Sequence, residues 1–320
     1  MDISDLNIPW IESPFFEKLL ARSDLDEATG AMVRAFAADG FLTFDPEIPD
    51  FDAVAAQIVE ACSRRAGYPQ RVTDAWPEIE GVRRLALAPR VLSLLRILYR
   101  REPIPMQTLN FGRGTEQHPH SDSMHFSSFP PGFMCGVWFA LEDIDDDNGP
   151  LVYYPGSHRL PYLDHTSIGI TASEQKGYER YGSYEDLVQM VIRELGMERR
   201  VLRMPKGKAL VWAANLLHGG SPIKDASRTR HSQVNHYFFE GCLYYQPQRS
   251  DPFLGRILWL DKRDVRTGRL IPQTYNGRPA PVRRGFGQRL EWLARRAGLD
   301  RALHGSRLAA LLRRALRRGG

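Results

Sequence analysis

The sequence lacks any hydrophobic run close to the roughly eighteen residues that a transmembrane helix needs. Its first ten residues, MDISDLNIPW, contain no basic segment followed by an apolar core, so a secretory signal is not expected. Only three cysteines occur in 320 residues (Cys62, Cys135 and Cys242), and no C-x-x-C pattern is present. Scarce cysteine argues for a reducing compartment and against a structural zinc site. These absences predict a cytoplasmic protein and exclude disulfide-stapled and membrane-spanning classes.

Lysine is absent from the last forty residues, but arginine gives this segment a high net positive charge. Residues 281–320 hold eleven arginines against two acidic residues, a net charge of +9, which leaves residues 1–280 at −4. The overall charge of +5 therefore describes the tail, and no nucleic-acid-binding surface is expected. A basic amphipathic helix over 286–320 would bind an anionic membrane or an acidic partner, or would pack its leucines on its own domain. Those leucines include Leu290, Leu293, Leu303, Leu308, Leu311, Leu312 and Leu316.

The chain changes character near residue 101. Helical periodicity predicts helices over 15–20, 25–40, 50–65 and 88–101, with a short strand at 41–45. Later runs bounded by Gly and Pro predict strands at 105–112, 133–144, 149–157, 199–204, 208–214 and 229–240. A helix at 183–196 lies in a long insertion at about 160–200. The aromatic residues of these strands are expected in the core, among them Phe139, Tyr153 and Trp212.

These elements predict three regions and an α+β class. Residues 1–101 form a mainly helical region that packs on the core, residues 102–246 form the β core, and residues 247–320 form an Arg-rich extension. Many short strands without regular βα alternation indicate a sandwich or barrel-like pair of sheets covered by helices. A double-stranded β-helix fits this pattern, but periodicity alone does not distinguish it from other sandwiches.

The segment QHPHSDSMHF contains candidate metal ligands. On an extended chain His120 and Asp122 project from the same face, so an imidazole and a carboxylate can reach one ion. His218 follows at the predicted end of an apolar strand, where Gly219 and Gly220 allow close backbone approach. Two histidines and one carboxylate occupy one face of an octahedron. This arrangement suits non-haem Fe(II), because it leaves two positions for a chelating cosubstrate and one for dioxygen.

Other histidines compete for these roles. His118 shares the face of His120, but it stands four residues from Asp122, which is too far along an extended strand. His120 is therefore favoured. His125 and His236 are expected to be polar residues of a partly buried surface, with a substrate contact by His125 as the alternative. The alternative without a metal site is that His120 and Asp122 are a surface pair and that His218 is an unrelated buried histidine.

A candidate carboxylate-binding pair follows His218. Arg230 and Ser232 alternate on a predicted strand and so share a face. A guanidinium holds both oxygens of a carboxylate, and a nearby hydroxyl can donate to it. Arg228 is the competitor, but only Arg230 has a serine at the matching alternate position. The pair predicts a cosubstrate that is a dicarboxylic keto acid.

With these motifs, residues 107–239 resemble the phytanoyl-CoA dioxygenase family of Fe(II)- and 2-oxoglutarate-dependent oxygenases. The resemblance lies in HSD at 120–122, WFALEDIDDDNGPLVYYPGSH at 138–158, LLHGGSP around residue 218 and RHS at 230–232. It implies a double-stranded β-helix (jelly roll), with N-terminal helices flanking the core and a basic C-terminal helical extension. It also implies a site with iron on His120, Asp122 and His218, the far carboxylate of 2-oxoglutarate on Arg230, and Trp138 beside the cosubstrate. The insertion is longer than the family pattern, and its helix is predicted to cover the pocket mouth.

The leading hypothesis is an Fe(II)- and 2-oxoglutarate-dependent dioxygenase. It would use O2 to hydroxylate a small-molecule or lipid-like substrate, with succinate and CO2 as coproducts. Halogenating relatives need an open coordination position where Asp122 stands, so this carboxylate favours hydroxylation. One alternative is a non-catalytic metal- or ligand-binding jelly roll with a membrane- or partner-binding tail. Another is a cupin-like dioxygenase without a keto acid, in which Arg230 and Ser232 would be coincidental.

Overall fold

The computed structural model describes residues 2–171 and 177–297. Its helices are α1 (Phe16–Ala21), α2 (Glu27–Asp39), α3 (Phe51–Ser63), α4 (Glu80–Ala86), α5 (Pro89–Tyr99), α6 (Gly177–Glu194) and α7 (Phe286–Arg296). The first strands are β1 (Phe41–Phe44), β2 (Val72–Thr73), β3 (Pro103–Phe111), β4 (Ser127–Phe129), β5 (Met134–Ala140), β6 (Leu151–Tyr153) and β7 (Arg200–Val201). The later strands are β8 (Ala209–Ala213), β9 (His218–Gly220), β10 (Ser232–Phe239), β11 (Leu243–Tyr245), β12 (Thr274–Tyr275) and β13 (Arg278–Pro279). Within these ranges, no helix combines the length and the apolar character that crossing a bilayer requires.

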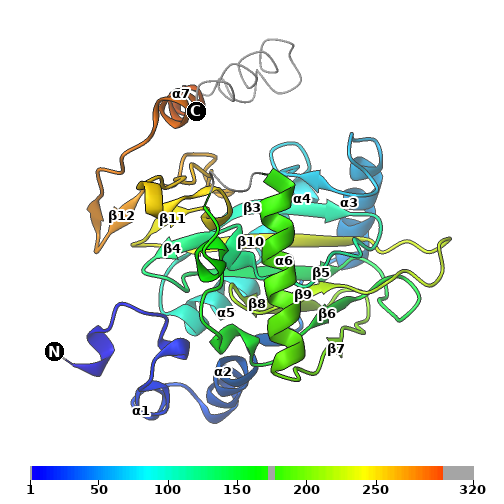
Figure 1. Ribbon diagram of the computed structural model, residues 1–320. Helices are drawn as coiled ribbons and strands as arrows, with labels where there is room; N and C mark the ends of the chain where they lie inside the picture. Colours follow the sequence, from blue (N-terminus) through cyan, green and yellow to red (C-terminus); the bar gives the residue numbers. More distant parts are fainter. Residues whose placement is uncertain (1, 172–176, 298–320) are drawn as a thin grey trace.

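Two antiparallel sheets form the core. The larger one has six strands in the order β1-β8-β5-β10-β3-β2, and the smaller one has three in the order β7-β6-β9. The small sheet faces the inner side of the large one: the ring of Tyr153 on β6 lies 4.3 Å from that of Phe41 on β1. Trp212 on β8 likewise contacts His218 on β9, with 5.0 Å between ring centroids. This pair of sheets is the predicted jelly roll, and helices flank it (Figure 1).

Both faces of strands β5, β8 and β10 of the six-stranded sheet are buried. Every residue of β5 is buried, because alternate side chains enter two different cores. Val137 and Phe139 pack with the N-terminal helices, whereas Trp138 and Ala140 pack toward the small sheet. A strand covered on both sides shows no polar alternation in its sequence. The pattern therefore located this strand but did not show which side chains face the site.

The predicted N-terminal helices are present, and their ends follow from local chemistry. The side chain of Asp26 accepts a hydrogen bond from the backbone N–H of Thr29 and caps α2. Gly40 ends α2 with φ +81°, a conformation that favours glycine. Helix α4 was not among the predicted helices. It has only seven residues, which is too short for a clear helical repeat.

The insertion carries α6, which crosses in front of the sheets in Figure 1. Tyr184 and Val188 on its inner face pack with Met124, Tyr154 and Leu217. The hydroxyl of Tyr184 accepts a hydrogen bond of 3.0 Å from the backbone N–H of Ser121. The inserted helix thus packs directly on the loop that carries the candidate metal ligands.

Helix α7 forms the described part of the basic tail. Gln288 and Arg295 donate hydrogen bonds to the backbone carbonyls of Ile257 and Asp261. Leu290 and Leu293 remain 40% and 47% exposed. Polar contacts therefore join α7 to the preceding segment, and these two leucines do not enter the core. The other predicted tail leucines, from Leu303 to Leu316, lie outside the described residues.

Candidate active site

Strand register brings the candidate site residues to one face of the large sheet. On β10, Ser232 and Val234 lie opposite Ala140 and Trp138 of β5. On its other side, β10 pairs with β3, so that Val234 lies opposite Leu109. Paired residues of antiparallel strands share a face, so this inner face runs across all three strands. It points toward the small sheet, where His218 begins β9.

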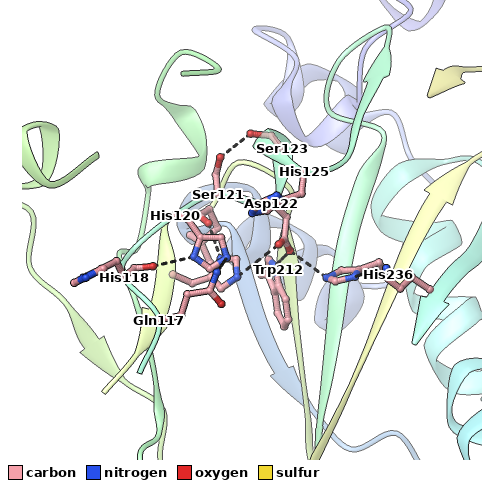
Figure 2. A network of polar contacts seen from close by, with 12 residues as sticks. Gln117, His118, His120, Ser121, Asp122, Ser123, His125, Trp212 and His236 are labelled. Atoms are coloured by element: carbon pink, nitrogen blue, oxygen red, sulfur yellow. Dashed lines mark hydrogen bonds and ion pairs between the residues drawn. The ribbon is translucent and has the colours of Figure 1, made fainter. Parts of the chain in front are cut away.

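His120, Asp122 and His218 converge at the end of this inner face. Figure 2 shows His120 and Asp122 with the side chains around them. One ligand atom from each lies within 4.8 Å of the others, and all three residues are buried. The backbones of His120 and His218 exchange two hydrogen bonds of 2.9 Å across an isolated β-bridge. A Cβ on Gly219 would lie 2.7 Å from the carbonyl oxygen of Gln117, so the glycine permits this close approach. The predicted trio is thus adjacent in space.

Hydrogen bonds fix both imidazoles in the orientation a metal ligand needs. Nδ1 of His120 donates to the carbonyl of His118, and Nδ1 of His218 donates to the carbonyl of Leu216, each at 2.9 Å. Nε2 of each ring therefore carries the lone pair that can bind a metal. Burial and the neighbouring His218 lower the pKa of His120 to about 3. A neutral imidazole is the form that ligates metals.

Asp122 is held by two side chains. Its Oδ2 accepts a hydrogen bond of 2.8 Å from Nε1 of Trp212, and Nε2 of His236 lies 3.4 Å from the same oxygen. Its Oδ1 lies 3.9 Å from Nε2 of His218. Burial alone would raise the pKa of this carboxyl, but His236 and His218 lower it well below its ordinary value. Asp122 is therefore an ionised carboxylate with one oxygen directed at the histidines.

Two local predictions about these ligands were wrong. Residues 120–122 do not form a strand: Asp122 begins a 3-10 turn (Asp122–Met124), and only His120 joins a β-bridge. His218 does not end the apolar strand, because β8 stops at Ala213 and a turn leads to β9 in the other sheet. The backbone of Ser121, between the two ligands, is nevertheless extended (φ −110°, ψ 144°), so His120 and Asp122 still project from the same side.

The competing histidines lie elsewhere. His118 is exposed, and in Figure 2 its ring points away from the cluster, so only its backbone carbonyl takes part. His125 lies between Gln248 and Tyr181 of α6, at 3.2 Å and 3.1 Å. Helix α6 therefore contacts His125 through Tyr181, and cover of the pocket mouth by the inserted helix stays a prediction.

Sequence reasoning missed Trp212 and His236. Trp212 was assigned to the core, and it is buried, yet its indole N–H binds Asp122. His236 was expected at a partly buried surface but is 4% exposed and contacts Asp122. The signal for His236 was present, since it alternates with Arg230 and Ser232 and so shares their face. Trp212 had no such signal, because both faces of β8 are buried.

We expect Trp212→Phe to weaken metal binding by roughly 10- to 100-fold, since partners that orient a ligand have effects of this size. Anaerobic calorimetric titration with Fe(II) measures the change. Trp10→Phe is the matched control, because it removes another buried indole bond, 2.9 Å to the carbonyl of Leu98, far from the site. Equal metal affinity in the two variants would show that Trp212 does not orient Asp122.

Arg230 is a buried cation beside the trio. It is 1% exposed, and it lines a cavity of about 80 Å3 together with His120, Asp122 and His218. The cavity also contains Trp138, whose ring centroid lies 5.8 Å from the guanidinium carbon. Among the described residues, Nε and Nη1 of Arg230 have no hydrogen-bond partner. Burial lowers the pKa of Arg230 to about 10, so the side chain stays charged at neutral pH.

This unpaired charge indicates an anionic ligand. Nη2 donates to the backbone carbonyl of Arg113 at 3.4 Å, but a buried cation without an anionic partner is costly, and a carboxylate would satisfy the two free donors at once. The hydroxyl of Ser232, on the same face of β10, is also buried and without a partner among the described residues. Arg228, the competitor, instead bonds to Asp145 at 3.0 Å near the surface. Arg230 and Ser232 therefore fit one end of a dicarboxylate.

The fold and the site define a jelly-roll protein with a buried His–Asp–His cluster that can hold one metal ion. The chain belongs to the phytanoyl-CoA dioxygenase family, whose sequence profile matches residues 48–232. The peroxisomal phytanoyl-CoA dioxygenase of Rattus norvegicus is 26% identical over 171 residues, 53% of this chain and 46% of the rat protein. Phytanoyl-CoA dioxygenase domain-containing protein 1 of Danio rerio is 35% identical over 80 residues, 24% of this chain and 28% of that protein. The matched segments thus span less than half of either relative.

Solved structures agree on the fold. The non-haem alpha ketoglutarate dependent carbocyclase SnoK from nogalamycin biosynthesis has a TM-score of 0.56 at 16% identity, over 75% of this chain and 94% of that chain. The epimerase SnoN in complex with Fe3+, alpha ketoglutarate and nogalamycin RO has a TM-score of 0.53 at 20% identity, over 81% and 94%. At these identities the likeness concerns the fold, which is the predicted jelly roll.

Proposed function

We propose that this protein is an Fe(II)- and 2-oxoglutarate-dependent oxygenase that hydroxylates a small molecule. The observation that carries the proposal is a single cavity that contains both the His–Asp–His cluster and the unpaired guanidinium of Arg230. Membership of the phytanoyl-CoA dioxygenase family supports it. The solved complex of SnoN with Fe3+ and alpha ketoglutarate supports the same pair of ligands.

The proposed ligands of iron are Nε2 of His120, Nε2 of His218 and Oδ1 of Asp122. Bound Fe(II) would supply the activation of dioxygen, coupled to decarboxylation of 2-oxoglutarate to succinate and CO2, with one oxygen atom delivered to a C–H bond. Trp212 and His236 keep the Asp122 carboxylate in place, so that little reorganisation accompanies metal binding.

The remaining side chains hold the cosubstrate and exclude water. Arg230 and Ser232 bind the far carboxylate of 2-oxoglutarate, so its keto-acid end is directed toward the three ligands. Trp138 forms a side wall beside the guanidinium. Leu109 and Val234 line the same cavity and keep this part of the site apolar. A dry, fixed environment favours the intended reaction over side reactions of the activated oxygen.

The presence of Asp122 is the reason for proposing hydroxylation. Its carboxylate fills the coordination position that a halide would need, so transfer of a hydroxyl group is the simplest outcome. Detection of a chlorinated product from the unmodified protein would contradict this part. The jelly roll does not by itself decide the outcome, since SnoK is described as a carbocyclase and SnoN as an epimerase.

Two alternative functions remain distinguishable. A binding protein without turnover has no use for a complete ligand set beside an unpaired, buried arginine. A cupin-like dioxygenase without a keto acid would leave Arg230 without a function. The cytoplasmic localisation, and the membrane or acidic partner of residues 286–320, stay predictions.

The test of the proposed function is succinate formation by the full chain supplied with Fe(II), 2-oxoglutarate and air. We expect slow succinate release even without a substrate, since decarboxylation can proceed uncoupled. Removing the metal with a chelator should abolish this release, and adding back Fe(II) but not Zn(II) should restore it, because zinc has no redox chemistry. Succinate release that persists after metal removal would contradict the proposal.

A further inference from the structure

A large groove leads from the candidate site to the edge of the six-stranded sheet. Its volume is about 1140 Å3, which exceeds that of typical small-molecule pockets. It shares His120, Asp122 and His236 with the inner cavity. A molecule bound in this groove would therefore reach the proposed metal position from outside, without displacing a cosubstrate at Arg230.

Two arginines line the outer part of the groove. The pairing of Thr73 with Leu109 places Arg71, just before β2, beside the end of β3. A tight turn holds this segment: the backbone N–H of Arg71 donates to the carbonyl of Gly67 at 2.8 Å, and Gly67 has φ +92°. Arg113 follows β3 on the same side of the groove. Arg71 and Arg113 thus belong to adjacent segments at one end of the sheet.

The charges of these arginines are not neutralised within the described part of the chain, where neither side chain has an acidic partner. Other arginines do pair: Arg203 bonds to Asp146, and Arg228 bonds to Asp145. Glu116 also lines the groove, and its carboxylate, which accepts a hydrogen bond of 3.0 Å from the backbone N–H of Ile223, offsets the charge of one arginine but not of both. The outer groove therefore carries an excess of positive charge.

The rest of the lining is mixed: Leu109, Phe111, Phe126 and Ile223 contribute apolar surface beside the polar side chains. Four glutamines contribute side-chain amides to it: Gln70, Gln107, Gln117 and Gln246. Three of these amides already have side-chain partners: Gln107 with His236, Gln117 with His120, and Gln246 with Gln248. The lining can therefore contact both polar and apolar parts of a molecule, and the two arginines are the groups that favour an anion.

We infer that the substrate is a polar small molecule with a carboxylate or phosphate group, which Arg71 and Arg113 bind at the outer end of the groove. Its reacting C–H bond then lies at the inner end, near His120 and Asp122. Arginine suits both kinds of anion, because its planar fork matches their oxygen atoms. The inference rests on the proposed function, since it places the reacting bond at the proposed iron.

The test is anaerobic binding of matched probes to the full chain loaded with Fe(II) and saturating 2-oxoglutarate, so that Arg230 is already occupied. The probes are phenyl phosphate against phenol, and benzoate against benzamide, measured by equilibrium dialysis. We expect at least one anion to bind roughly tenfold or more tightly than its neutral counterpart. The double variant Arg71→Gln/Arg113→Gln should remove this preference. The control Arg228→Gln should keep it, because Arg228 lies outside the groove.

Two results would overturn the inference: equal binding of both anions and their neutral counterparts, or a preference for the anion that persists in the double variant. A preference for phenyl phosphate over phenol indicates a phosphate group on the substrate, and a preference for benzoate over benzamide indicates a carboxylate. The same samples are then exposed to air and assayed for succinate. Succinate formation without arginine-dependent binding would refute the groove assignment alone, whereas arginine-dependent binding without succinate would refute the proposed function alone.

Discussion

The His218→Ala protein is expected to form no Fe(II)-dependent succinate. This change removes one of three proposed ligands, so the loss of metal affinity should exceed the roughly 10- to 100-fold effect of losing an outer partner. Alanine variants of His120 and Asp122 should behave in the same way, because each supplies one ligand atom to the cluster. Anaerobic calorimetry with Fe(II) and succinate determination measure the two losses separately.

His118→Ala is the matched control. His118 stands two residues before His120, but it is exposed and contributes only its backbone carbonyl, which alanine retains. This variant should bind metal and form succinate like the unmodified protein. Thermal unfolding of each variant shows whether its fold is intact. Normal succinate formation by a folded His218→Ala protein, or its loss in His118→Ala, would refute the ligand assignment.

The second large effect is expected for Arg230→Gln, in the requirement for 2-oxoglutarate. A charge-assisted contact contributes about 1.5–3 kcal/mol, so its loss should raise the 2-oxoglutarate concentration at half-maximal rate by roughly tenfold to a hundredfold. Fe(II) affinity should not change, because Arg230 contacts none of the proposed ligands. Succinate formation as a function of 2-oxoglutarate concentration measures this change.

Stability separates this role of Arg230 from a structural one. The guanidinium is buried and largely unpaired in the ligand-free protein, so replacing it should not lower the free energy of unfolding. 2-Oxoglutarate should raise the melting temperature of the unmodified protein but not that of Arg230→Gln, since a ligand stabilises the state that binds it. Arg228→Gln should match the unmodified protein in both assays. If Arg228→Gln raises the 2-oxoglutarate requirement instead, Arg228 and not Arg230 binds the carboxylate.

The sequence predicts which residues form the site better than it predicts the backbone conformation around them. His120, Asp122 and His218 were identified from residue type and spacing, and the structure brings them together. Extended backbone at Ser121 places His120 and Asp122 on one side, as their spacing indicates, but the chain enters a 3-10 turn at Asp122 and does not continue as a strand. The backbone N–H of Ser121 donates to the hydroxyl of Tyr184 on α6, which is distant in sequence. Spacing along the chain cannot reveal such a contact.

The residues that contact the proposed ligands from outside could not be predicted from the sequence either. Trp212 reaches Asp122 because Gly136, opposite it on β5, leaves room: a Cβ there would lie 2.4 Å from the indole. Neither residue is unusual in an apolar strand, so composition does not distinguish this pair from ordinary core packing. The sequence also offered no indication of the two groove arginines, Arg71 and Arg113. Arg71 lies in a segment without clear periodicity, and only the pairing of β2 with β3 brings it near the site.

The measurement that tests the central claim most directly is the fate of dioxygen. The full chain is supplied with Fe(II), 2-oxoglutarate and 18O2, and the succinate is analysed by mass spectrometry. Oxidative decarboxylation by this site predicts succinate that carries one 18O atom, produced by the unmodified protein and absent from the His218→Ala protein. Unlabelled succinate, or labelled succinate in equal amounts from both proteins, would contradict the assignment of this cavity as an Fe(II)- and 2-oxoglutarate-dependent oxygenase site.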